Sequence, residues 1–192
     1  MSAALIALAS CAKPAPDAPV APPSPQARSP TPPDPLARAQ AAADELGRTM
    51  RGRLQAAMVE GGPARAVEVC SSEAPTIAAE IAGRTKVRVG RASLRMRGAS
   101  TAPDWVASWL REQGERPAEG VVGFARVEGS HARVLRPIPI EAPCLTCHGQ
   151  ELAPEIAKLL DARYPQDQAR GYALGALRGA LWAEVDLPAN AP

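Results

Sequence analysis

The residues with the clearest chemical role are two cysteines and the histidine that directly follows the second: Cys144, Cys147 and His148, in the stretch Cys-Leu-Thr-Cys-His. This spacing is the attachment signature of c-type haem. Each thiol can add across one haem vinyl group, and the adjoining imidazole can coordinate the iron as its proximal ligand. The motif therefore predicts one covalently bound haem c on Cys144 and Cys147, with His148 as an iron ligand.

Two other kinds of site use a pair of cysteines at this spacing. A zinc site would need a second pair of ligands at similar spacing, and the sequence has none. A thioredoxin-like redox pair would open a helix in a βαβ setting, which the surrounding pattern does not provide. We therefore favour covalent haem over both.

Length and composition limit the remaining possibilities. The 192 residues, less a proline-rich front, suit one ordinary domain. A formal net charge of +2 indicates no particular partner, so nucleic acid is not expected. Four cysteines are too few for a disulfide framework in a chain of this length.

The first residues form a short apolar run that ends in Leu-Ala-Ser-Cys at Cys11. This ending resembles a bacterial lipobox, so residues 1–11 are interpreted as the remnant of a signal with Cys11 as the lipidated residue. The run is shorter than a usual signal peptide and no basic residue precedes it, so we expect the signal to begin upstream. A frayed cytoplasmic terminus is the alternative. It is less favoured because c-type haem is attached after export, and the predicted location is the periplasm, with a lipid anchor in the membrane.

Residues 12–35 contain ten of the 21 prolines. Such a segment cannot bury a core and favours extended, polyproline II conformations. Behind a lipidated Cys11, it is expected to be a disordered tether. A proline-rich ligand for a partner is the less favoured alternative.

Helices are predicted next. The first begins at Leu36 and carries an apolar stripe at four-residue spacing: Leu46, Met50, Leu54 and Met58. Gly61 and Gly62 should end this helix, and Pro63 should begin a second one that carries Cys70. A short helix is expected from Pro75. Met50 and Met58 are interpreted as core residues, not as iron ligands.

Strands mixed with helices follow. Residues 86–91 alternate basic and apolar side chains, a strand pattern that continues to Leu94 and Met96. Most arginines of this row are expected in solvent, with one or two available to haem propionates. Further predicted elements are a helix from 103 to 114, a hairpin of strands 121–127 and 132–140, a helix from 154 to about 164 and a strand from 180 to 187. His131, at the hairpin turn, is expected to be exposed and not an iron ligand. The predicted class is α+β, with an antiparallel sheet flanked by helices and an N-terminal helical segment.

Several short segments occur in a characteristic order: GGPARAVEVC at 61–70, Ala74-Pro75 with Ile77-Ala78, Val89-Gly90-Arg91, Pro103-Asp104, Pro137-Ile138 before the haem motif, Tyr164-Pro165-Gln166-Asp167, Gly171-Tyr172 and Arg178-Gly179-Ala180. Together they resemble the PAS-like c-type haem domain family, first met as a domain of unknown function and typified by a cyanobacterial protein with His and Cys axial haem ligands. The resemblance covers residues 36–188. It implies a PAS-like antiparallel sheet, a single haem and Cys70 as the distal iron ligand. The chain departs from the family at 97–99, where Arg-Gly-Ala replaces a frequent Arg-Asn-Pro.

Counting the cysteines leads to the same residue. If Cys11 carries lipid and Cys144 and Cys147 carry haem, Cys70 is the remaining thiol. Iron ligation would explain a leftover thiol in an oxidising compartment, and a buried inert cysteine is the alternative.

Two classes of function fit these predictions. The first is a redox or gas sensor that binds carbon monoxide or nitric oxide on reduced iron and signals to a separate protein, because no kinase, cyclase or transmembrane output segment is present. The second is a periplasmic electron carrier. An enzyme such as a peroxidase would need an open iron position with a distal acid–base pair. No such pair is recognisable, so we expect no enzymatic activity.

Overall fold

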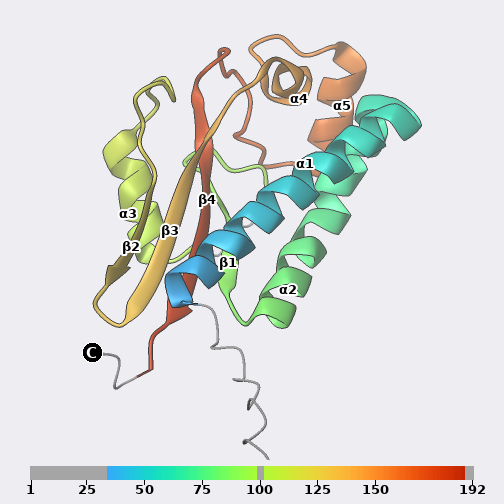
Figure 1. Ribbon diagram of the computed structural model, residues 1–192. Helices are drawn as coiled ribbons and strands as arrows, with labels where there is room; N and C mark the ends of the chain where they lie inside the picture. The colour runs from blue at the N-terminus through green and yellow to red at the C-terminus, as the bar shows by residue number, and fades with distance from the viewer. Residues whose placement is uncertain (1–33, 99–101, 189–192) are drawn as a thin grey trace, which may run out of the picture. The chain divides into compact units, whose positions relative to one another are not determined.

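A four-stranded antiparallel sheet is the centre of the computed structural model, which describes residues 34–98 and 102–188 (Figure 1). The strands are β1 (Arg88–Ala92), β2 (Phe124–Glu128), β3 (His131–Pro139) and β4 (Leu177–Asp186). Their order in the sheet is β1-β4-β3-β2, so the last strand of the chain lies inside the sheet between the first and the third. The predicted α+β class with an antiparallel sheet is confirmed.

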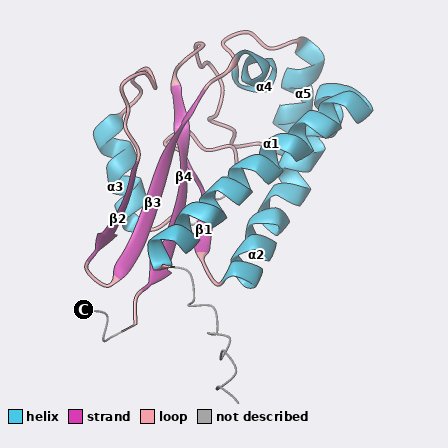
Figure 2. Ribbon diagram, in the orientation of Figure 1, coloured by secondary structure: helices cyan, strands magenta, loops and turns pink. Residues whose placement is uncertain are grey.

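Figure 2 shows how the helices surround this sheet. The long α1 (Pro35–Glu68) and α2 (Ala74–Thr85) cover one face, and α3 (Asp104–Gln113) packs on the other. A π-helical turn (Val69–Glu73) joins α1 to α2. The short α4 (Leu145–His148) and α5 (Pro154–Arg163) lie near the end of α1. None of the helices in the described ranges is long and apolar enough to cross a membrane.

The two faces of β4 bury different side chains because successive residues of a strand point to opposite sides. Ala183 and Val185 pack against an alanine-rich surface of α1 that includes Ala39, Ala42, Ala43 and Leu46. Ala180 and Trp182 point the other way and pack against Val106 and Leu110 of α3. The two helix layers therefore pack against opposite faces of β4.

A glycine in β1 makes room for the largest of these side chains. Gly90 is paired with Trp182 across the sheet, and a Cβ at Gly90 would lie 2.9 Å from the indole ring. A side chain at this position would therefore collide with Trp182, and glycine lets the indole lie flat over the strand.

The first helix follows its sequence signals. Asp34 caps it by accepting a hydrogen bond from the Ala37 N–H (3.2 Å), and Pro35 occupies the first turn. Gly61 and Gly62 have non-helical backbone angles and kink the helix at the predicted break. The predicted apolar stripe is only partly buried. Leu46 is buried and Met50 packs on the same core, but Leu54 and Met58 are each 37% exposed, so the core prediction for these two residues is wrong.

The predicted extension of the first strand through Leu94 and Met96 is also wrong. β1 ends at Ala92, and the chain then turns, with the Ser93 hydroxyl donating to the Arg95 carbonyl (2.8 Å). Leu94 and Met96 are 39% and 43% exposed. The alternating pattern continues past the strand because the turn also places successive side chains in different surroundings.

Candidate functional site

The Cys-Leu-Thr-Cys-His stretch follows directly after β3. The strand leads into a 3₁₀ turn (Ala142–Cys144), which passes into α4 and ends at His148. Cys144 packs with a cluster that contains Ile140, Ala169 and Tyr172. Cys147 packs with a different cluster, which contains Val67, Ile156 and Leu160. The two thiols are free and lie against separate apolar clusters.

His148 is held in one orientation. Its Nδ1 donates a hydrogen bond to the Ala169 carbonyl (2.6 Å), because a carbonyl oxygen can only accept. The lone pair is therefore on Nε2, the nitrogen left for a metal. The ring of Tyr172 meets the imidazole edge to face, with centroids 6.3 Å apart and an interplanar angle of 82°.

The protonation state of His148 suits a metal ligand. Burial lowers the pKa of His148 to about 3, helped by the positive charges of Arg178 and Arg97. The imidazole is therefore neutral at ordinary pH, which is the form that coordinates metals.

A set of residues that we call the Asp167 clamp fixes the carbonyl that His148 uses. Asp167, 2% exposed, binds the Arg97 guanidinium through both oxygens, at 3.1 Å to Nε and 3.0 Å to Nη2. It also accepts from Arg170 Nε (2.7 Å) and the Ala169 N–H (2.9 Å). Arg97 donates in turn to the carbonyls of Cys147 (2.5 Å) and Ala169 (3.2 Å). Its guanidinium is thus used to hold the haem motif and the Ala169 loop together, and it does not extend into solvent as most of its row was expected to do.

Cys70 lies in the π-helical turn after α1. A π-turn is rare and often marks a functional site. The hydroxyls of Ser71 and Ser72 both donate to the Glu68 carbonyl (2.9 and 2.8 Å), which occupies a backbone acceptor at the point where the helix widens. Glu73 closes the turn by binding the Arg53 guanidinium at 2.6 and 3.0 Å and Arg65 Nη2 at 2.9 Å.

The structure brings Cys70 next to the haem motif. Val67, three residues before Cys70, packs in the same apolar cluster as Cys147. Burial raises the pKa of Cys147, and a negative charge on Cys70 raises it further. Burial raises the pKa of Cys70, and the charges of Arg91, Arg97 and Arg178 oppose that effect. Arg97 and Arg178 act on His148 as well, so Cys70 and His148 share the same positively charged surroundings.

Other residues considered as ligands lie elsewhere. His131 begins β3 while the motif follows the end of that strand, so the length of β3 separates them. It contacts Ser130 and Asp186, each at 3.3 Å. Cys11 and the lipobox lie outside the described residues. In residues 34–98 and 102–188, no three His, Cys, Asp or Glu side chains gather in a group that could hold a metal ion.

Sequence reasoning did not find the residues that support the motif. Asp167 and Arg178 were noticed only as parts of the family resemblance, and Ala169 contributes a backbone carbonyl that no pattern reveals. The local signal for the clamp is Arg170 three residues after Asp167, whereas Arg97 is far from Asp167 in the sequence.

Comparisons with known proteins agree with this description. The model of the Tll0287-like family matches residues 27–185. The solved structures include a similar one, described as the crystal structure of the cyanobacterial heme-protein Tll0287, with 23% sequence identity and a TM-score of 0.60. The match covers 84% of this chain and 100% of that chain, and it shows that the two share a fold. No curated protein sequence matches the chain. The family match, over most of the chain, shows that this protein belongs to the Tll0287-like family.

Proposed function

We propose that this protein binds one haem covalently through Cys144 and Cys147, with His148 and Cys70 as axial ligands, and acts as a redox or gas sensor in the periplasm. The observation that carries the proposal is the hydrogen bond from His148 Nδ1 to the Ala169 carbonyl (2.6 Å). It leaves Nε2 of a neutral imidazole for the iron, directly after two free thiols at the attachment spacing. The fold shared with a protein described as a heme-protein supports it further.

The donor set fits a c-type haem. Two thiols in separate apolar surroundings would form the thioethers, and an imidazole and a thiolate are both common iron ligands. When bound, the haem would supply an iron that changes between Fe(III) and Fe(II) and takes diatomic gases. His148 keeps its proton at Nδ1 and cannot rotate without breaking its bond to Ala169.

Cys70 is the ligand that we expect to leave. Its pKa is raised by burial, so its thiolate is stable mainly where a cation lies close. A ferric centre stabilises the thiolate more strongly than a ferrous centre does. Cys70 would therefore loosen or take up a proton on reduction, which would leave an iron position for carbon monoxide or nitric oxide. This redox-dependent exchange favours sensing over simple electron transfer.

Covalent attachment is tested on the purified wild-type protein and on Cys144→Ala and Cys147→Ala. We expect acidified organic solvent to leave the haem on the wild-type chain and each variant to retain haem through one thioether or to lose it. Haem extracted from the wild-type protein would refute covalent binding.

The ligand pair is tested by absorption and EPR spectra of the ferric protein. A thiolate–imidazole pair should give a low-spin spectrum that Cys70→Ala abolishes, with a raised midpoint potential because a negative charge leaves the iron. His131→Ala, at the far end of β3, is the control and should retain the wild-type spectrum. If Cys70→Ala retained the wild-type ferric spectrum and potential, Cys70 would not be the ligand, and an unchanged ligand set on reduction would favour the electron carrier.

A further inference from the structure

Arg178, the second residue of β4, is held by neutral groups. Its Nη1 donates to the Ser93 hydroxyl and to the Arg95 carbonyl (3.2 Å). Its guanidinium carbon lies 5.5 Å from the ring centroid of Tyr172. The Nε atom of Arg178 is buried and has no hydrogen-bond partner among the described residues. A buried N–H without an acceptor is unusual in a folded protein and points to a group that the chain does not supply.

Two other arginines show what the Nε and Nη2 atoms of a guanidinium bind. Arg97 uses Nε and Nη2 to hold both oxygens of Asp167, and Arg53 uses the same two atoms to hold Glu73. These two N–H groups point in parallel and match the two oxygens of a carboxylate. In Arg178 the Nη1 atom is occupied and Nε has no partner among the described residues, so a carboxylate would bind on the Nε side.

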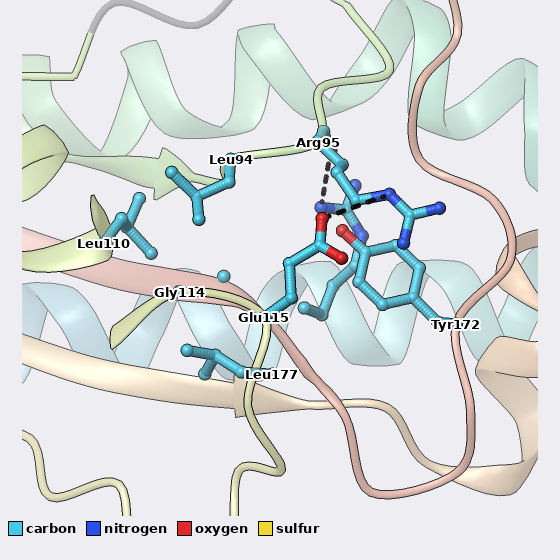
Figure 3. Close-up of a pocket in the computed structure, with 9 residues that line it drawn as sticks. Leu94, Arg95, Leu110, Gly114, Glu115, Tyr172 and Leu177 are labelled. Atoms are coloured by element: carbon cyan, nitrogen blue, oxygen red, sulfur yellow. Dashed lines mark hydrogen bonds and ion pairs between the residues drawn. The ribbon is translucent and has the colours of Figure 1, made fainter. Parts of the chain in front are cut away.

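The charge of Arg178 also lacks a partner of opposite sign. Within residues 34–98 and 102–188, no carboxylate forms an ion pair with it, whereas the neighbouring Arg95 lies 3.8 Å from Glu115 (Figure 3). Burial lowers the pKa of Arg178, which shows that its surroundings disfavour the cation. A buried charge of this kind is usually matched by an anion.

The position of Arg178 identifies that anion. Tyr172 lies between Arg178 and His148, with its ring edge-on to the imidazole at 6.3 Å. Among the charges around His148, that of Arg178 has the largest effect on the imidazole, and it also acts on Cys70. Arg178 and His148 therefore lie against the same Tyr172 ring, on the side of the molecule where the proposed haem would bind. The anionic groups that a haem carries are its two propionate carboxylates.

We propose that Arg178 binds a haem propionate through the Nε and Nη2 atoms of its guanidinium. This inference rests on the proposed function, because it requires that the haem occupies the site of His148. Arg178 would then orient the edge of the haem opposite the thioethers, and the propionate would neutralise the buried cation.

Resonance Raman spectra of the purified holoprotein test this role, because the propionate bending bands shift with hydrogen bonding to the carboxylate. We expect Arg178→Gln to move one of these bands to lower frequency. Arg178→Lys should give a smaller shift, since an ammonium keeps the charge but cannot donate two parallel hydrogen bonds. Arg95→Gln is the matched control. It removes an arginine that stacks on the same Tyr172 ring at 4.4 Å but already donates to the Gln168 carbonyl, and its bands should match the wild type.

A haem-loaded Arg178→Gln with wild-type propionate bands would overturn the assignment. If that variant does not fold, Arg178→Lys decides in its place, because unchanged bands there contradict the paired hydrogen bond. Solvent extraction of the same wild-type sample separates the two proposals. Loss of haem from the wild-type protein refutes covalent attachment. If the wild-type protein retains its haem but the propionate bending bands are the same in the Arg178 variants, only the role of Arg178 is refuted.

Discussion

At the scale of single residues, Asp167 holds in place the groups that contact the haem motif. Burial would raise the pKa of its carboxyl, but the hydrogen bonds from Arg97, Arg170 and the Ala169 N–H together lower it. A folded pKa below the unfolded value means that the carboxylate stabilises the fold above the unfolded pKa of about 3.9. That contribution is lost as the pH falls through the folded value.

Asp167→Asn should therefore lower the free energy of unfolding near neutral pH by about 3 kcal/mol, the typical cost of breaking a buried ion pair. The difference from wild type should shrink as the pH falls below about 4, where the carboxyl of the unfolded chain takes up a proton, and it should disappear once the folded carboxyl is also protonated. Urea unfolding over a series of pH values measures both effects.

Asp161→Asn is the matched control, since Asp161 binds the same Arg170 at 2.8 Å but is 69% exposed. We expect a change of at most about 1 kcal/mol from it. Equal losses in the two variants would show that the clamp adds nothing beyond a surface ion pair.

The residues of the clamp also show which parts of the site can be recognised from the sequence. Cys144, Cys147 and His148 are recognisable because their chemistry fixes their spacing in the chain. Their supports do not share this property. Ala169 lies 21 residues from His148, and the Arg97–Asp167 pair spans 70 residues, so only the folded chain brings them together.

At the scale of elements, the π-turn that carries Cys70 depends on the ion pairs of Glu73. Glu73 accepts three hydrogen bonds from Arg53 and Arg65. Arg53 lies before the kink at Gly61 and Gly62, and Arg65 lies after it. These bonds fix the end of the turn relative to both halves of α1. The position of the Cys70 thiol then follows from backbone atoms that Glu73 holds.

Glu73→Gln should loosen this turn without removing the thiol. We expect faster amide hydrogen exchange over residues 69–73 and, in the ferric holoprotein, a weakened thiolate signal in the EPR spectrum. Glu68→Gln is the control. Among the described residues, the exposed Glu68 carboxylate pairs with Arg65 alone (2.7 Å), and its backbone carbonyl still accepts from Ser71 and Ser72. A Glu73→Gln protein with unaltered exchange in this segment would contradict the role given to Glu73.

Element boundaries were predictable where a residue type determines the backbone. Pro35, Pro63 and the Gly61–Gly62 pair occur where the first helix begins and kinks, because their allowed dihedral angles permit little else. The π-turn was not predictable, since its sequence Val-Cys-Ser-Ser-Glu also suits an ordinary helix. The predicted length of β1 was wrong for a similar reason, because alternation of apolar and polar residues alone does not distinguish a strand from an extended turn.

At the scale of the whole molecule, the lipid anchor predicted at Cys11 is a separate matter from the haem domain. Cys11→Ala should move the protein from the membrane fraction to the soluble periplasm, because the predicted lipid has no other thiol of the lipobox to attach to. The absorption spectrum should stay as in the wild type, since a proline-rich tether does not transmit structure from the anchor to the domain. Fractionation of cells with immunoblotting measures the first effect. Unchanged membrane association in Cys11→Ala would refute lipidation.

The class of the fold followed from the sequence, but the order of its strands did not. The hairpin of β2 and β3 is local and was visible from Gly129 and Ser130. The pairing of β1 with β4 joins Gly90 to Trp182, two residues with the rest of the sheet between them in the chain. Local patterns do not encode such a pairing, and the shape match of Gly90 and Trp182 is apparent only when both strands are in place.

The place of β4 at the centre of the sheet has a consequence for biogenesis. Under the proposed export to the periplasm, the haem motif would leave the translocon before β4, because the motif precedes β4 in the chain. Until β4 arrives, β1 has no neighbour in the sheet and β3 has a neighbour on one side only. The domain cannot close around Cys144 and Cys147 during that interval. With haem attached covalently as proposed, the strand order would leave both thiols accessible on an incompletely folded chain until the last strand arrives.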